Sequence, residues 1–177
     1  HGEKELALDC AKIQGVPCII TVHHGGIICP AGSLMDCKDT ICNRPVTDRN
    51  CLQCGCRNIP GSAFWYFLLC IIPFSVRLQL ADFFRKRPFV LFLTPVFTVT
   101  AAIEAKRRFI EKLKNADRIL LPCKKLLEIF KENGIQKNLT ILPHAIPEIE
   151  QSSFPPVTDK IRFFYLGRIC YVKGLHI

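Results

Sequence analysis

The sequence predicts an α/β fold, a Rossmann-like parallel sheet with helices, from three apolar runs and the helix between two of them. Residues 16–22 are almost all apolar, which is typical of a strand buried on both faces of a parallel sheet. Residues 118–121 and 139–142 are shorter runs of the same kind. Between them, residues 124–133 repeat large apolar side chains at helical spacing and end at Gly134. Strand, helix and strand at this spacing predict a βαβ unit with a right-handed crossover.

The remaining elements follow in chain order. Residues 3–14 predict a first helix, with Leu6, Leu8, Ala11 and Ile13 as its candidate apolar positions. The next run ends at His23, at the carboxyl end of a strand expected to be central in the sheet, where open α/β sheets place their ligands. The sequence predicts a partial Rossmann-like domain over residues 1–143, which includes a cysteine-rich loop at 24–61 and an apolar and basic helical region at 62–115. A proline-rich linker at 144–160 is expected to follow, and then the first strand and phosphate loop of a second domain at 161–177.

Composition limits the class of partner. The chain has 177 residues, a formal net charge of +9 and a pI near 9.1, so we expect an anionic partner: nucleic acid, a membrane surface or a phosphorylated substrate. Residues 1–15 contain no continuous apolar core, so no secretory signal is expected. The eleven cysteines are therefore interpreted as thiols of a cytoplasmic protein.

The cysteine-rich loop contains a candidate metal site. Cys51 and Cys54 form a Cys-x-x-Cys pair, and Cys29 and Cys42 precede it in the same loop. Four thiolates can hold a tetrahedral structural zinc ion, which would order a long loop. Free thiols and disulfides are the alternatives, and a reducing compartment disfavours the second.

The apolar middle of the chain has more than one interpretation. Residues 63–76 and 88–103 are apolar but short, and each contains a proline. Basic residues flank them: Arg77, Arg85, Lys86, Arg87, Lys106, Arg107, Arg108, Lys112 and Lys114. Such helices can lie among the headgroups of an anionic membrane, on its cytoplasmic face, or pack under the sheet with solvated basic ends. A transmembrane hairpin is a third, less favoured interpretation because of the short runs and the prolines.

A candidate phosphate loop follows the apolar run at residues 161–166. Gly167 and Gly174 let the backbone approach a ligand closely, and Arg168 and Lys173 offer two cations to a diphosphate. By itself the pattern also fits a solvated basic loop.

The order of these segments resembles a known enzyme family. A Gly-Val-Pro strand ending in histidine at residues 15–23, a strand followed by proline at 118–122, a Leu-Pro-His segment at 142–144 and the Gly-Arg and Lys-Gly loop at 167–174 are similar to the middle of a retaining glycosyltransferase of family 4, of the GT-B type. If so, the chain is expected to be a fragment that lacks both ends of the enzyme and is inactive alone.

The resemblance implies an activity and a site. It implies transfer of a sugar, with retention, from a nucleotide-diphosphate sugar to an acceptor hydroxyl on a glycan or lipid-linked molecule. His23 would be the catalytic residue, with His24 as the alternative functional imidazole, and Gly167, Arg168, Lys173 and Gly174 would bind the donor diphosphate. Two cations on the phosphates would make a metal or other cofactor unnecessary for catalysis.

The sequence departs from the family at three places, and two other classes of function stay open. His24 stands where the family has aspartate, Cys123 where it has serine, and His144-Ala145 where it has Asn-Gly. One alternative is a basic, zinc-stabilised nucleic-acid-binding module, and another is a non-catalytic glycosyltransferase-like protein. No nucleic acid is expected as a partner, because the aromatic residues lie in apolar runs and do not alternate with basic ones.

Overall fold

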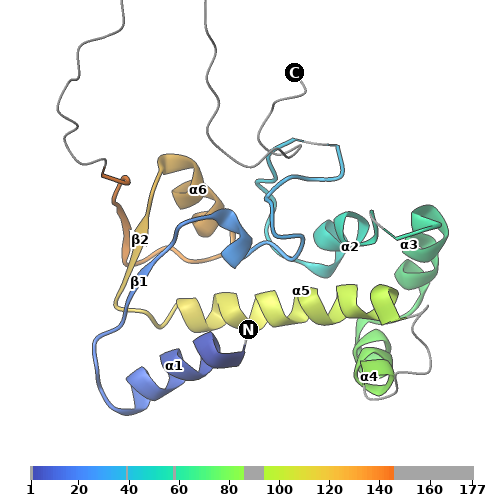
Figure 1. Ribbon diagram of the computed structural model, residues 1–177, viewed down its shortest axis with the longest axis horizontal. Helices are drawn as coiled ribbons and strands as arrows, with labels where there is room; N and C mark the ends of the chain where they lie inside the picture. Colours follow the sequence, from blue (N-terminus) through green and yellow to red (C-terminus); the bar gives the residue numbers. More distant parts are fainter. Residues whose placement is uncertain (1, 39, 58, 86–93, 146–177) are drawn as a thin grey trace, which may run out of the picture. The chain divides into compact units, whose positions relative to one another are not determined.

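A computed structural model describes residues 2–38, 40–57, 59–85 and 94–145 (Figure 1). This part of the chain is a mixed α/β structure with a three-stranded parallel sheet and six α-helices. Most of the predicted linker, the predicted strand at 161–166 and the phosphate loop with Gly167, Arg168, Lys173 and Gly174 lie outside the described residues.

The sheet has the order β1-β2-β3. Strand β1 (Ile19–Thr21) pairs in parallel with β2 (Arg118–Leu121), which pairs in parallel with β3 (Leu139–Ile141). Helix α6 (Lys124–Glu132) connects β2 to β3 and ends before Gly134, whose φ of 77° is one that glycine adopts without strain. The predicted βαβ unit is confirmed.

The prediction for residues 16–22 is wrong in two respects. Within the described residues β1 is an edge strand, not a central one, and Ile19 is 63% exposed rather than buried. Ile119 and Leu121 are buried, whereas Arg118 on the same strand and Ile19 and Thr21 on β1 are exposed. Burial on both faces would need a second layer of helices on the exposed face of the sheet, and the described residues do not supply one.

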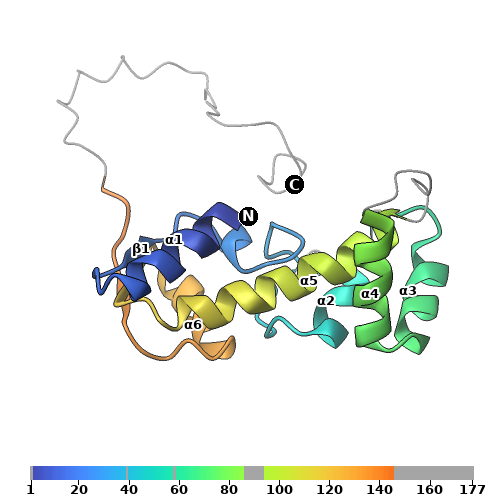
Figure 2. The ribbon, with the colours of Figure 1, turned by 90° about the horizontal axis from the view of Figure 1, so that it is seen from below.

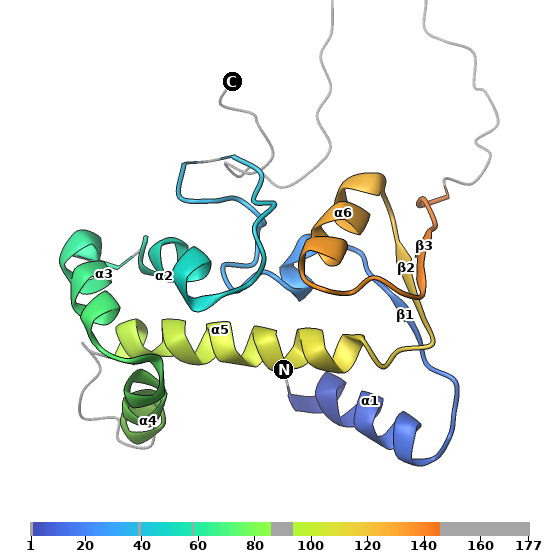
Figure 3. The ribbon, with the colours of Figure 1, turned by 180° about the vertical axis from the view of Figure 1, so that it is seen from behind.

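The buried face of the sheet packs against α6 and the carboxyl-terminal half of α5 (Thr94–Leu113), beside which lies α1 (Gly2–Ile13) (Figures 2 and 3). We call these elements, with the sheet, the sheet half. Its fully or nearly buried side chains are Val22, Ile28, Phe109, Ile110, Leu113, Ala116, Ile119, Leu121, Leu126, Ile129, Phe130 and Ile135.

A second core lies at the amino-terminal half of α5. There α2 (Asp48–Cys56), α3 (Ser62–Ile71) and α4 (Phe74–Arg85) form what we call the helical half. Its buried side chains are Leu52, Cys56, Leu69, Ala81, Val96, Phe97 and Ile103. One interpretation of the apolar middle required its helices to pack under the sheet. Helix α3 does not do so, because it packs in this second core.

The prediction that the flanking basic residues are solvated is wrong for Arg77. It is 2% exposed, and its guanidinium forms an ion pair with Asp48 and donates to the carbonyl oxygen of Ile72 at 3.0 Å. It also donates to the Thr100 hydroxyl at 3.5 Å. This arginine joins α2, α4 and α5 and is not available to a partner.

No single helix in the described residues is long and apolar enough to cross a membrane. Helices α3 and α4 meet these criteria only as a pair, and the pair is bent by 119°.

Candidate functional site

A pocket of about 240 Å³ opens where β1 ends. After β1 come Val22, His23 and His24, and then the single-turn 3₁₀ helix η1 (Gly25–Ile27). Helix α5 supplies the opposite wall. The pocket is lined by Thr21, His23, His24, Gly26, Ile27, Pro30, Ala102, Ala105, Lys106 and Phe109.

His24 is oriented by the backbone that follows it. Its Nδ1 accepts a hydrogen bond from the Gly26 N–H at 3.0 Å, which caps η1. With Nδ1 as the acceptor, a neutral imidazole carries its proton on Nε2. The turn needs a glycine at position 26, because a Cβ there would lie 2.4 Å from the Gly32 carbonyl oxygen and 2.8 Å from the ring of His24. His24 thus supplies the cap of this turn.

Lys106 brings a positive charge to the pocket from α5. Its Nζ donates to the carbonyl oxygens of Gly26 and Ile27, at 2.7 and 3.0 Å. These bonds tie the turn after β1 to α5 across about 80 residues of sequence. An ammonium group that lines the same pocket as two imidazoles suits a pocket that receives an anionic or strongly polar group.

The sequence identified part of this pocket. His23 follows the end of β1, as predicted, although β1 is an edge strand, and it lines the pocket together with His24. In the sequence, Lys106 is one of several basic residues that flank the apolar runs, and its charge alone does not separate it from the others. Its spacing from Ala102, Ala105 and Phe109 on one helical face was the available signal, but its carbonyl partners depend on the tertiary fold.

The cysteines gather around α2. Cys51 and Cys54 lie one turn apart on that helix, and Cys54 is hydrogen-bonded to Cys37. Cys29 and Cys42 lie near Cys51. All ten cysteines of the described residues are free thiols, so the disulfide alternative is not realised there. Within the same ranges, no three cysteine, histidine, aspartate or glutamate side chains are arranged to hold a metal ion. The structural zinc ion stays a prediction.

Burial controls the chemistry of this thiol cluster. It raises the pKa of Cys51 to about 12, and the nearby Cys29, Cys42 and Cys54 add to the effect. Burial also raises the pKa of Cys54, with a further contribution from Cys37. Without a metal, these two side chains are therefore neutral thiols at physiological pH and poor nucleophiles.

Asp36 orders the loop that carries Cys37 and Cys42. Its carboxylate accepts from the backbone N–H groups of Thr40 and Lys38, at 3.0 and 2.8 Å, and these bonds lower its pKa. The loop also forms an antiparallel bridge between Met35 and Ile41. These backbone hydrogen bonds order the loop segment that carries Cys37 and Cys42.

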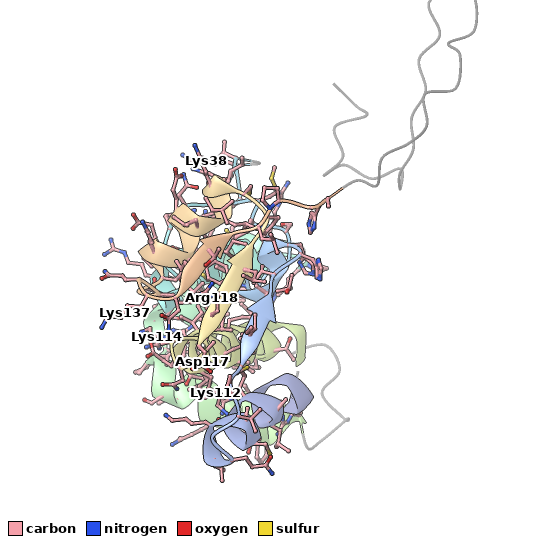
Figure 4. The ribbon with its side chains drawn as sticks, turned by 90° about the vertical axis from the view of Figure 1, so that its left-hand side faces the viewer. Lys38, Lys112, Lys114, Asp117, Arg118 and Lys137 are labelled. Carbon is pink, nitrogen blue, oxygen red and sulfur yellow. The ribbon has the colours of Figure 1, made fainter. Side chains whose placement is uncertain are left out.

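Basic residues also gather at the edge of the sheet where β2 begins, away from the pocket. Figure 4 shows Lys112, Lys114, Arg118 and Lys137 around Asp117. Lys112 pairs with Asp9, and Lys114 pairs with Glu111 at 2.7 Å. Asp117 accepts from the Cys18 N–H at 2.6 Å. Since acids neutralise part of this cluster, it provides little support for a nucleic-acid interface.

Comparison of the chain with protein-family models, with curated proteins and with solved structures finds no match.

Proposed function

We propose that this chain belongs to an enzyme that transfers a sugar, with retention, from a nucleotide-diphosphate sugar to an acceptor hydroxyl on a glycan or lipid-linked molecule. The observation that supports this most is the pocket at the carboxyl end of β1, lined by His23, His24 and Lys106. Parallel α/β sheets bind their ligands at this end of the strands. The order of sequence motifs supplies the reaction class.

In this proposal the donor diphosphate is held by Arg168 and Lys173, with Gly167 and Gly174 letting the backbone approach. The cations stabilise the negative charge that develops on the leaving diphosphate as the glycosidic bond breaks. His23 lines the sugar side of the site and orients or polarises the transferred group. The acceptor hydroxyl attacks from the same face, so no enzyme nucleophile is needed.

Lys106 and His24 have supporting roles. Lys106 fixes the turn at Gly26 and Ile27, and so sets the position of both imidazoles relative to α5. His24 caps the same turn through Nδ1. We therefore regard both as positioning residues, and His23 as the catalytic residue.

The test uses the full-length protein with a panel of nucleotide-diphosphate sugars and measures release of the nucleoside diphosphate. We expect His23→Ala to lower turnover about 100-fold or more while diphosphate binding, measured by calorimetry, persists. Arg168→Ala and Lys173→Ala should each weaken both. Lys137→Met, an exposed lysine outside the pocket, is the matched control and should leave both unchanged.

Two results would defeat the proposal. One is wild-type affinity for nucleoside diphosphates in the Arg168→Ala/Lys173→Ala double variant. The other is full turnover in His23→Ala. Binding without turnover for every donor would instead favour the non-catalytic glycosyltransferase-like alternative.

A further inference from the structure

Helix α3 carries an exposed apolar face that the helical core does not use. Phe64, Phe67 and Ile71 are 63%, 67% and 65% exposed. Their spacing of three and four residues places them on one side of the helix. On the other side Leu69 is fully buried, and Trp65 packs against the same core. The helix is thus apolar all round, although only one side is covered.

No charged residue occurs in α3. The helix reads Ser-Ala-Phe-Trp-Tyr-Phe-Leu-Leu-Cys-Ile. It joins α4 through Ile72 and Pro73, and Val76 and Phe83 on α4 are also exposed. Ten helical residues rise about 15 Å, against about 30 Å for the hydrocarbon core of a bilayer. Such a helix is suited to lie at a membrane surface, not to span it.

Two exposed arginines lie at the two ends of α4, the helix that follows α3. The guanidinium of Arg107 lies 5.7 Å from the centre of the Phe74 ring, at the start of α4, and Arg85 ends the same helix. Both are exposed and form surface ion pairs, Arg107 with Glu104 at 3.6 Å and Arg85 with Asp82 at 3.1 Å. Surface pairs of this kind contribute little stability, so either arginine can exchange its carboxylate for a lipid phosphate.

The size of the face favours a lipid surface over a protein. A large aromatic side chain buries roughly 200 Å², so three side chains at about two-thirds exposure present about 400 Å². A stable protein interface needs about 800 Å² from each partner. The face offers no polar group to specify a protein partner, whereas apolar side chains with arginine beside them are typical of helices bound at a membrane interface.

We propose that the face of α3 formed by Phe64, Phe67 and Ile71 inserts into the interface of an anionic membrane, with Arg85 and Arg107 at the level of the lipid phosphates. This proposal goes beyond sugar transfer and does not depend on it. It concerns α3, α4 and Arg107 of α5, all within the described residues.

Trp65 makes the proposal directly testable. It is the only tryptophan of the chain, and its ring contacts Phe64 at 5.4 Å between centroids. Vesicles of phosphatidylcholine and phosphatidylglycerol with brominated acyl chains should quench its fluorescence, since bromine quenches only at short range. Vesicles of brominated phosphatidylcholine alone should quench it less, because the arginines then lack anionic lipids to bind.

Flotation with the same anionic vesicles gives the second measurement. The triple variant Phe64→Ser/Phe67→Ser/Ile71→Ser should lose vesicle affinity by about tenfold or more. The matched control is Leu6→Ser/Ile13→Ser on α1, whose side chains are 67% and 84% exposed, and it should float like the wild type. Because all five side chains are exposed, both variants should keep the wild-type circular dichroism spectrum and Tm.

Several outcomes would overturn the proposal. Unquenched Trp65 in the wild type, or a triple variant that floats as well as the wild type, would do so. A wild type that dimerises without binding vesicles, and a triple variant that is monomeric, would show that a second copy covers this face. None of these outcomes involves a sugar donor, so failure here is distinct from failure of the proposed activity.

Discussion

The sheet half and the helical half share α5 but are stabilised differently. The sheet half encloses Phe130, Ile119 and Leu113 at or near zero exposure, with no charged side chain among them. The helical half has a smaller apolar core, contains the buried Arg77, and leaves the large side chains of α3 in contact with solvent. The first half is built to be stable and to hold the pocket. The helical half buries fewer apolar side chains, exposes one face of α3, and has a polar network that joins its helices.

The largest effect should come from the sheet core. Phe130→Ala removes a fully buried ring and should lower the free energy of unfolding by about 3–5 kcal/mol, from lost burial and a cavity. Urea unfolding followed by circular dichroism measures it. Phe67→Ala, on the exposed face of α3, should change stability by less than about 0.5 kcal/mol. If the two variants lost similar free energies of unfolding, the side chain of Phe67 would have to be buried, and the two halves would not differ in how they are stabilised.

The polar network of the helical half should come second. Arg77→Ala leaves the carboxylate of Asp48 without its cation and should destabilise by about 2–4 kcal/mol. The control is Arg85→Ala, whose partner Asp82 is exposed, with an expected loss below about 1 kcal/mol. Trp65 fluorescence reports unfolding of this half. If Arg77→Ala matched the wild type, the ion pair would have no structural role.

The same contrast shows what the sequence could and could not reveal. Strand β2 and helix α6 were predicted to within a residue, because their apolar spacing and the glycine that ends α6 are local signals. The exposure of Ile19 was missed, since it depends on which strands flank β1. Arg77 looked like a solvated cation because its partner Asp48 lies 29 residues away.

The candidate site shows the same limit. His23 was predicted from its place at a strand end, which is a property of the local sequence. Lys106 reaches the pocket only because α5 crosses the turn after β1, and no local pattern encodes that contact.

Thiol reactivity sharpens the comparison in the helical half. Since burial raises the pKa of Cys51 to about 12, iodoacetamide at pH 8 should modify it about tenfold or more slowly than the exposed Cys10 on α1. Peptide mass spectrometry over time measures both rates. The unfolded thiol, with a pKa near 9, ionises first, so this cysteine's contribution to stability is complete below that pH and is lost as the pH rises towards 12. Equal rates at the two cysteines would show that Cys51 is open to solvent.

The smallest effect concerns how the two halves begin a helix. In the helical half, the Thr47 hydroxyl caps α2 by accepting from the Asn50 N–H at 3.2 Å. In the sheet half, Cys123 occupies the N-cap of α6 with extended backbone angles, φ −154° and ψ 161°, but its side chain makes no capping bond. A serine hydroxyl there could accept from the backbone N–H two or three residues on.

We therefore expect Cys123→Ser to raise the free energy of unfolding by about 0.5–1 kcal/mol, and Thr47→Ala to lower it by about 1 kcal/mol. Cys123→Ala should match the wild type within a few tenths of a kcal/mol, because it neither adds nor removes a capping bond. Urea titration of the three variants alongside the wild type separates these values. A serine variant no more stable than the alanine variant would mean that the first turn of α6 is already satisfied by other groups, and that the missing cap is not a weakness of the sheet half.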